Sequence, residues 1–276
     1  MAVDHYENFP VASILLPPAL RAPIAAIYQF ARQADDFADE GDLTPSQRLA
    51  LLDGFRQELN MLTAIDASNK PSEHPVFRRL QPFVRQYRLP VSAFHDLLDA
   101  FCQDIVKTRY ANYDELLDYC QRSAAPVGRL LLRLFDADSA HNLQRSDAIC
   151  SALQLINHWQ DIAIDFAKGR IYLPADDMQR FQVDEAQIES HRGDDRWTAL
   201  MAFQVDRARK LMLSGAALGT DLPGRIGLEI RAIVAGGLRI LKKIEAVNYD
   251  IFRRRPQLGI LDWNLILYRA LTTRYR

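Results

Sequence analysis

The chain has 276 residues, of which 49% are hydrophobic and 25% are charged, and its formal net charge at neutral pH is −1. These values are typical of one or two globular domains, and the charge argues against a nucleic-acid-binding surface, which normally needs a basic excess. Cys102, Cys120 and Cys150 form no CxxC pair, so neither a disulfide framework nor a zinc site is indicated, and a reducing cytoplasm fits best.

The sequence contains no sign of a signal peptide or of a membrane-spanning segment. Its first residues lack a basic region followed by an apolar run, and no stretch of about 18 uninterrupted apolar residues exists. The longest candidate, 226–241, is broken by Glu229, Arg231 and Arg239. We therefore predict a cytoplasmic protein, which a water-insoluble substrate could still bring into peripheral contact with a membrane surface.

Almost every segment shows the helical period, and no run shows sustained strand-like alternation, so we predict an all-α fold. Helices are expected over about 17–41, 45–64, 74–87, 92–108, 112–135, 184–190, 195–218, 223–253 and 261–272, with another through Asp161. Pro82 is expected to limit the third helix, and Pro126 and Gly128 to interrupt the fifth. Because no internal repeat is apparent, we predict a single-domain bundle around one deep apolar pocket.

A row of polar side chains marks the segment from residue 154 to residue 174. Gln154, Asn157, Asp161 and Asp165 follow one another at steps of three, four and four residues, which places them on one face of a helix. Most of the residues between them are apolar, so this row belongs to an otherwise buried helix. Carboxylates that leave water need cations, and oxygen ligands with room for water suit Mg²⁺.

A second acidic row lies far upstream, between residues 35 and 40. Asp35 and Asp39 are four residues apart, as are Asp36 and Glu40, and Arg32 precedes them by one turn. Like charges at this spacing repel each other, so something must neutralise them. One such row alone is most often a solvated helix face, but two rows in apolar helices favour a cluster of Mg²⁺ ions around a diphosphate.

Three segments resemble the signature regions of the squalene/phytoene synthase family. They are RQADDFADE at 32–40, YCQRSAAPVG at 119–128 and the segment 154–174, and the likeness extends from residue 8 to Pro256. Within that family the chain most resembles the bacterial hydroxysqualene synthases of hopanoid biosynthesis, which convert presqualene diphosphate and water to hydroxysqualene. The resemblance implies one class I isoprenoid synthase domain over residues 1–276.

The resemblance also implies roles for individual residues. The expected Mg²⁺ ligands are Asp35, Asp39, Asn157, Asp161 and Asp165, with Asp36 and Glu40 as supplementary ligands. The expected diphosphate ligands are Arg32, Lys168, Arg170 and Tyr172, while Gln154 faces the reacting carbons. Ser13, Arg109 and Tyr249 are further candidate substrate contacts. For Arg109, Lys168 and Arg170 a simpler reading is a charge that complements a helix C-terminus, and for Tyr249 it is core packing.

One segment departs from the family pattern. Family members that join two prenyl chains generally carry a further tyrosine just after the Tyr-Cys pair, thought to act as an acid or base, but Gln121, Arg122 and Ser123 occupy these positions. No Gly-x-Gly-x-x-Gly fingerprint exists, so no nicotinamide cofactor is expected. The missing tyrosine and the missing nucleotide fingerprint both agree with a reaction in which ionisation is followed by capture of water. His158 could orient that water, or it could be structural.

Three functions remain open on the sequence. The first is a lyase that makes hydroxysqualene from presqualene diphosphate, coupled to a presqualene diphosphate synthase and to a downstream desaturase or reductase. The second is a head-to-head prenyl transferase that makes presqualene diphosphate, squalene or phytoene-type products. The third is a catalytically silent assembly or binding protein, which the acidic rows disfavour because they destabilise the fold unless ions fill them.

Overall fold

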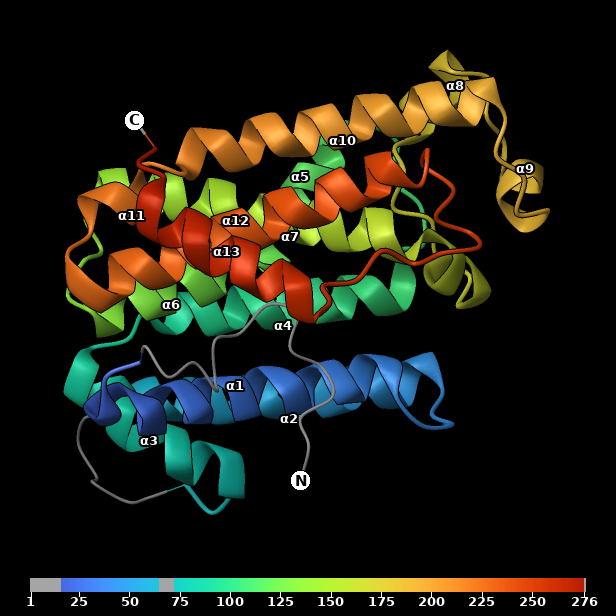
Figure 1. Cartoon of the computed structure of the whole chain (residues 1–276). Coiled ribbons are helices and arrows are strands. Elements are labelled where there is room, and N and C mark those ends of the chain that lie inside the picture. Colours follow the sequence, from blue (N-terminus) through green and yellow to red (C-terminus); the bar gives the residue numbers. More distant parts are fainter. Residues whose placement is uncertain (1–15, 65–71, 276) are drawn as a thin grey trace. The chain divides into compact units, whose positions relative to one another are not determined.

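A computed structural model describes residues 16–64 and 72–275, and within these ranges the secondary structure is α-helical apart from one isolated bridge between Arg109 and Ile171 (Figure 1). The predicted all-α class is therefore confirmed. The chain separates into two compact units. Unit 1 comprises Met1–Lys107 and Arg122–Leu143, and unit 2 comprises Thr108–Gln121 and Gln144–Arg276. Ser13 lies outside the described residues.

The helices of unit 1 are α1 (Pro18–Asp39), α2 (Pro45–Ala64), α3 (Pro75–Tyr87), α4 (Val91–Val106) and α6 (Ala125–Leu134). Those of unit 2 are α8 (Ala175–Arg180), α9 (Glu185–Glu189), α10 (Asp195–Gly215), α11 (Leu218–Asp221), α12 (Gly224–Ala246) and α13 (Ile260–Thr272). Two helices, α5 (Tyr113–Ser123) and α7 (Ala140–Ala167), place most of their residues in unit 2.

The core of unit 1 is built around an aromatic cluster on α1 to α4. The ring of Phe30 on α1 is fully buried and lies 5.5, 5.7 and 5.1 Å from the rings of Phe55, Phe77 and Phe94. The contacts with Phe77 and Phe94 are edge-to-face, which is a favoured geometry for aromatic pairs. This cluster fixes the face of α1 opposite its acidic residues.

The end of α1, which carries the acidic row, is held by the start of α2. Gly41 has a φ of 74°, a conformation that glycine adopts without strain. The Arg48 guanidinium donates to the carbonyl oxygens of Phe37 and Glu40, both at 3.0 Å, and to that of Gly41 at 2.6 Å. Thr44 and Gln47 have the spacing of a capping box in the sequence, and the Thr44 amide donates to Gln47 Oε1 at 2.9 Å.

Three predicted helix boundaries are wrong. α3 continues through Pro82 because this residue lies on the exposed face, where the Arg78 carbonyl that loses its donor can bind water. The break between α5 and α6 falls at Ala124, so Pro126 lies in the first turn of α6, where proline needs no amide partner, and Gly128 lies inside the helix. α12 ends at Ala246 rather than near residue 253.

The early end of α12 has a local cause, because Asn248 and Tyr249 follow it with φ values of 51° and 60°. This left-handed conformation cannot continue a right-handed helix, so the chain turns away from the α12 axis. The short helices α8 and α11 were not predicted from the sequence, since neither is long enough to show a helical period. No helix within the described residues is long and apolar enough to cross a bilayer.

Unit 2 depends on close approaches between helices at glycines. A methyl group at Gly215 of α10 would overlap the Arg145 carbonyl oxygen of α7 and lie 2.8 Å from Ile149. A methyl group at Gly237 of α12 would lie 2.7 Å from Met212 of α10 and 3.3 Å from Ile156 of α7. These glycines let α10 and α12 pack directly against α7, the helix that carries the second polar row.

We predict that Gly215→Ala lowers the free energy of unfolding by about 1–3 kcal/mol, because the added methyl group overpacks the contact between α7 and α10. Gly54→Ala is the matched control. Gly54 lies inside α2, and a methyl group there would meet nothing within 4 Å. This substitution should raise the free energy of unfolding by about 0.5–1 kcal/mol. Urea unfolding measures both values, and equal midpoints for Gly215→Ala and the parent would contradict the packing described.

Candidate active site

The polar row on α7 has the burial expected from the sequence. Gln154, Asn157, Asp161 and Asp165 are all half-buried. Around them the side chains of α7 that are fully buried include Leu155, Ile156, Trp159 and Ile162. Ile164 departs from the prediction, since it is 48% exposed. The row is therefore a strip of oxygen-bearing side chains on a helix whose other faces are mainly packed.

Asp161 forms an ion pair with Arg255, a residue of the segment between α12 and α13. The Arg255 Nε donates to Asp161 Oδ1, and one terminal nitrogen donates to Oδ2 at 3.0 Å. The side chains are only 14% and 26% exposed. Beside this pair the Gln160 amide donates to the Pro256 carbonyl oxygen at 2.6 Å. A two-point contact of this kind is the strong form of an arginine–carboxylate interaction, so Arg255 neutralises Asp161 directly.

Arg255, the last of three consecutive arginines at 253–255, is not among the site residues predicted from the sequence. A usable signal existed, because a carboxylate row on a buried helix requires a cationic partner and this run of arginines lies in the same chain. Spacing could not pair the two, since Asp161 and Arg255 are 94 residues apart.

The oxygen donors on α7 suit a hard cation such as Mg²⁺. The Asn157 Oδ1 atom is buried and has no hydrogen-bond partner among the described residues, so it is an acceptor that a cation would satisfy. Among the described residues, no three His, Cys, Asp or Glu side chains are grouped to hold one metal ion. Mg²⁺ is usually bound by one or two carboxylates and completed by water and phosphate oxygens, so Asn157, Asp161 and Asp165 fit it.

His158, next to this row, belongs to an aromatic stack. Its ring lies 3.7 Å from that of Tyr172 at an interplanar angle of 14°, and Tyr119 and Tyr110 extend the group at 5.8 and 5.6 Å from Tyr172. Burial, and next the charge of Arg170, lower the pKa of His158 to about 3. The imidazole is therefore neutral at physiological pH, and its Nδ1 lies 4.0 Å from Asp165 Oδ2.

A tight turn follows α7 and places Lys168, Arg170 and Tyr172 near the row. Gly169 adopts a φ of 78°, as a glycine in the predicted turn can, and the Arg170 amide donates to the Asp165 carbonyl oxygen at 2.8 Å. The Ile171 amide then donates to the Thr108 carbonyl oxygen at 2.9 Å. This turn keeps two cations and the Tyr172 ring at the C-terminal end of the polar strip.

Arg109 fastens this turn to α9. Its guanidinium donates to both carboxylate oxygens of Glu185 at 2.7 and 2.8 Å, and to the carbonyl oxygens of Gly169 and Thr108 at 2.7 and 2.8 Å. The pairing raises the pKa of Arg109 and lowers that of Glu185. All three guanidinium nitrogens are thus used within the protein, so in this structure Arg109 positions the turn that bears Lys168 and Arg170.

The first acidic row, in unit 1, has its own counter-ion. Arg32 lies 3.3 Å from Asp35 and 2.7 Å from Asp36, and all three side chains are between 32% and 42% exposed. Asp39 is half-buried at the end of α1, and Glu40, which follows it, is exposed. Arg32 therefore accounts for part of the neutralisation that the sequence required, while its predicted contact with a diphosphate stays a prediction.

The structure thus assembles two groups of predicted site residues. Unit 1 holds Arg32, Asp35, Asp36, Asp39 and Glu40 on and just after α1. Unit 2 holds Gln154, Asn157, Asp161 and Asp165 on α7, with Lys168, Arg170, Tyr172 and Arg109 around the turn that follows.

Tyr249, also in unit 2, lies beyond α12 rather than at its end. It is half-buried, and its carbonyl oxygen accepts a hydrogen bond from Trp197 Nε1 at 3.0 Å.

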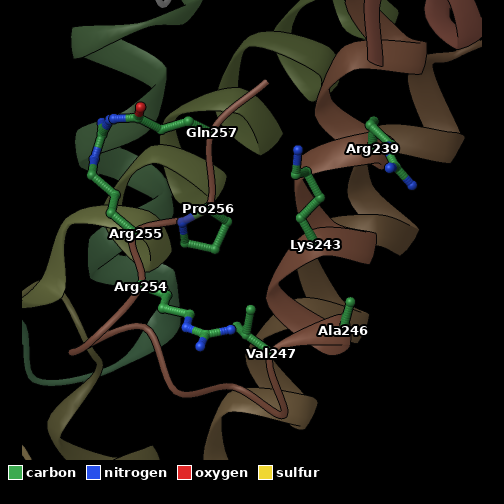
Figure 2. A pocket seen from close by; sticks show the side chains of 8 residues that line it. All are labelled: Arg239, Lys243, Ala246, Val247, Arg254, Arg255, Pro256 and Gln257. Carbon is green, nitrogen blue, oxygen red and sulfur yellow. The ribbon is translucent and has the colours of Figure 1, made fainter. Parts of the chain in front are cut away.

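A pocket of about 420 Å³ opens between α12 and the segment that carries Arg255 (Figure 2). Its cationic lining residues are Arg239 and Lys243 on α12, and Arg254 and Arg255 on the segment; no carboxylate lines it. Lys243 and Arg239 both pair with Asp262 of α13. The wall suits anionic groups, and Arg255 belongs both to this wall and to the ion pair with Asp161.

The segment that departs from the family pattern lies at the end of α5. Tyr119 is buried in the aromatic stack, and Gln121 is exposed. Arg122 donates to Gln103 Oε1 at 2.8 Å, and the Ser123 hydroxyl is buried without a hydrogen-bond partner. None of the three residues after Cys120 carries a phenol.

Comparisons with known proteins agree with these features. The sequence model of the squalene/phytoene synthase family matches residues 2–262. The chain is 31% identical to a hydroxysqualene synthase of Sinorhizobium fredii, over 95% of this chain and 86% of the relative. It is also 32% identical to a phytoene synthase of Mycobacterium bovis, over 97% of this chain and 87% of the relative.

Among solved structures, the chain is similar to the squalene synthase HpnC from Alicyclobacillus acidocaldarius. The TM-score is 0.80 and the identity is 37%, over 89% of this chain and 90% of that one. The all-α fold is therefore of the isoprenoid synthase type. The family consists of enzymes that act on prenyl diphosphates. With a family match over nearly its whole length and both acidic rows in place on their helices, this chain belongs to the squalene/phytoene synthase family.

Proposed function

We propose that this chain is a hydroxysqualene synthase, which converts presqualene diphosphate and water to hydroxysqualene and diphosphate. The proposal rests on one observation: the end of α5 carries Gln121, Arg122 and Ser123, and none of these residues is the further tyrosine. Without that phenol the joining of two prenyl chains lacks its expected acid or base, while ionisation of a diphosphate does not need it. The relative from Sinorhizobium fredii supports the same choice.

Within the proposal, the residues of α7 and its turn bind the leaving group. Lys168, Arg170 and Tyr172 contact diphosphate oxygens, and Gln154 faces the carbons that react. The resemblance implies that Asn157, Asp161 and Asp165, and also the acidic row of α1, hold Mg²⁺, which would neutralise the charge that develops on the departing diphosphate. The carbon–oxygen bond to diphosphate breaks, the carbocation rearranges, and water adds to it and releases a proton.

The ion pair between Arg255 and Asp161 gives this proposal a specific requirement. Asp161 keeps lone pairs for a metal ion while it accepts two hydrogen bonds from Arg255, but the positive charge of this guanidinium opposes the binding of a divalent ion beside it. Arg255 therefore competes with the metal for Asp161. Once displaced, it remains in the wall of the cation-lined pocket, where it can interact with an anionic group.

A head-to-head prenyl transferase is the second candidate, and a phytoene synthase that is 32% identical over 97% of this chain favours it. The two enzymes differ in the bond that forms after ionisation. A transferase joins two prenyl chains, whereas the proposed enzyme adds water.

We expect purified protein with Mg²⁺ to convert presqualene diphosphate to an alcohol without any nicotinamide cofactor, and to do little with farnesyl diphosphate alone. Products are identified by mass spectrometry after each substrate is supplied separately. Asp161→Asn and Asp39→Asn should each lower kcat by about a hundredfold or more, because each removes a carboxylate that the proposal assigns to Mg²⁺ binding. Formation of a C30 diphosphate from farnesyl diphosphate would instead support the transferase.

Removing the competing cation should tighten metal binding. We expect Arg255→Gln to bind Mn²⁺, a spectroscopically visible substitute for Mg²⁺, about tenfold more tightly than the parent, and to unfold at a lower temperature in the absence of metal. Arg253→Gln is the matched control, because it removes the same charge from a side chain that is 81% exposed. Unchanged or weaker Mn²⁺ binding in Arg255→Gln would argue against competition at Asp161.

His158 is assigned a structural role, since its ring is buried against Tyr172. Because its pKa is about 3 in the folded protein and about 6.5 in the unfolded chain, only the unfolded state gains this proton as the pH falls below 6.5. The group therefore leaves the free energy of unfolding unchanged above pH 6.5 and lowers it increasingly as the pH falls from 6.5 toward 3. From pH 7 to pH 5 the loss is about 2 kcal/mol.

We expect His158→Phe, which keeps a ring against Tyr172, to remove this part of the acid destabilisation. Urea unfolding of both proteins at pH 7 and pH 5 measures the difference. The variant should also still form the alcohol. If the variant released diphosphate but formed no alcohol, His158 would instead be the residue that orients the water.

A further inference from the structure

Among the described residues, α13 carries more exposed large hydrophobic side chains than any other helix. It includes Ile260, Leu261, Trp263, Leu267, Tyr268 and Leu271, which are between 55% and 86% exposed. Isolated apolar side chains on a surface are ordinary, but six large ones on a helix of 13 residues form a continuous patch.

These side chains do not contribute to the attachment of α13. The helix is fixed to α12 by its opposite face, where Asp262, Ile266 and Ala270 are buried at intervals of four residues. Asp262 pairs with Arg239 at 2.6 Å and with Lys243, whose hydrogen bond is the largest cause of a pKa for Asp262 below its usual range. Arg231 donates to the Ala270 carbonyl oxygen at 2.6 Å. The outward residues are therefore not needed to hold the helix in place.

The exposed charges that flank the patch along the chain are mainly arginines, and one of them, Arg253, pairs with Asp250 at 3.8 Å. Asp262 is the only carboxylate of α13, and it is buried and paired on the inner face. Arg253 and Arg254 are exposed just before the helix, and Arg274 is exposed just after it. The patch is thus an uncharged apolar strip with arginines beyond both of its ends.

We propose that this face of α13 is a docking surface for an anionic lipid bilayer. Leucine and isoleucine side chains of an interfacial helix enter the boundary between headgroups and acyl chains, and tryptophan and tyrosine favour that depth because one end of each ring is polar. Arginines beyond the ends of the strip contact lipid phosphates. The proposal rests on the surface alone, and it would hold for any activity of the chain.

A second copy of the chain fits this face less well. Antiparallel pairing of two α13 helices would bring Arg253 and Arg254 of one copy toward Arg274 of the other, and parallel pairing would bring each arginine toward its own equivalent. The helix offers no exposed carboxylate to offset either arrangement. Like charges facing each other oppose association, whereas an anionic surface attracts all three arginines.

Flotation of the full chain with vesicles tests the proposal. We expect it to bind vesicles of phosphatidylcholine containing phosphatidylglycerol, in a buffer without divalent cations, and to bind pure phosphatidylcholine more weakly. The double variant Trp263→Ser/Leu267→Ser should lower the partition coefficient by about tenfold or more, since both side chains lie on the outward face. Arg253→Ser and Arg254→Ser should each lower binding to the anionic vesicles by about fivefold.

The matched control is Leu213→Ser, which removes a leucine that is 44% exposed on α10. Its vesicle binding should equal that of the parent, and circular dichroism checks that each variant is folded. The proposal is overturned if the parent does not float with anionic vesicles, or if the double variant binds as well as the parent. A dimer that the double variant abolishes, without any vesicle binding, would assign the face to a second copy and would equally overturn it.

Discussion

The arrangement of unit 2 depends on how the carboxylates of a largely buried helix are neutralised. α7 is packed on most of its sides by apolar residues, yet it carries Asp161 and Asp165 with side chains that are only 14% and 18% exposed. A charge in this position is unfavourable without a partner, because it loses much of its hydration. In this structure Arg255 supplies the partner, and the segment that carries it is held against α7 by the hydrogen bond from Gln160 to Pro256.

This constraint connects several features that are distant in the sequence. α12 ends early, and the left-handed residues Asn248 and Tyr249 redirect the chain so that Arg255 reaches α7. The same segment then leads into α13, which Asp262 fastens to Arg239 and Lys243. A metal ion that replaced Arg255 at Asp161 would therefore release one contact of the segment that borders both the cation-lined pocket and the last helix.

Family membership and product are different conclusions, and they rest on different residues. The match over residues 2–262 places the chain in a family that acts on prenyl diphosphates, and the resemblance assigns the ionisation step to the acidic rows and the basic turn after α7. The product depends on which molecule reacts with the carbocation. Over nearly the full chain, one relative called hydroxysqualene synthase and one called phytoene synthase have almost the same identity, 31% and 32%, so these two matches do not distinguish the products. The proposal that water is the partner rests on Gln121, Arg122 and Ser123, which lack the phenol that the resemblance associates with chain joining.

The sequence by itself determined the fold class, the capping of α2 by Thr44 and Gln47, the turn at Gly169 and the placing of Gln154, Asn157, Asp161 and Asp165 on one face of α7. These features follow from periodicity and from local backbone chemistry, which act over a few residues. Only the tertiary structure decided that Arg255 neutralises Asp161, that Arg109 is tied to Glu185, that His158 stacks on Tyr172, and that Pro82 is tolerated inside α3. These outcomes depend on which side chains meet across distances of 14 to 94 residues, or on which face of a helix meets water, and a local pattern contains neither kind of information.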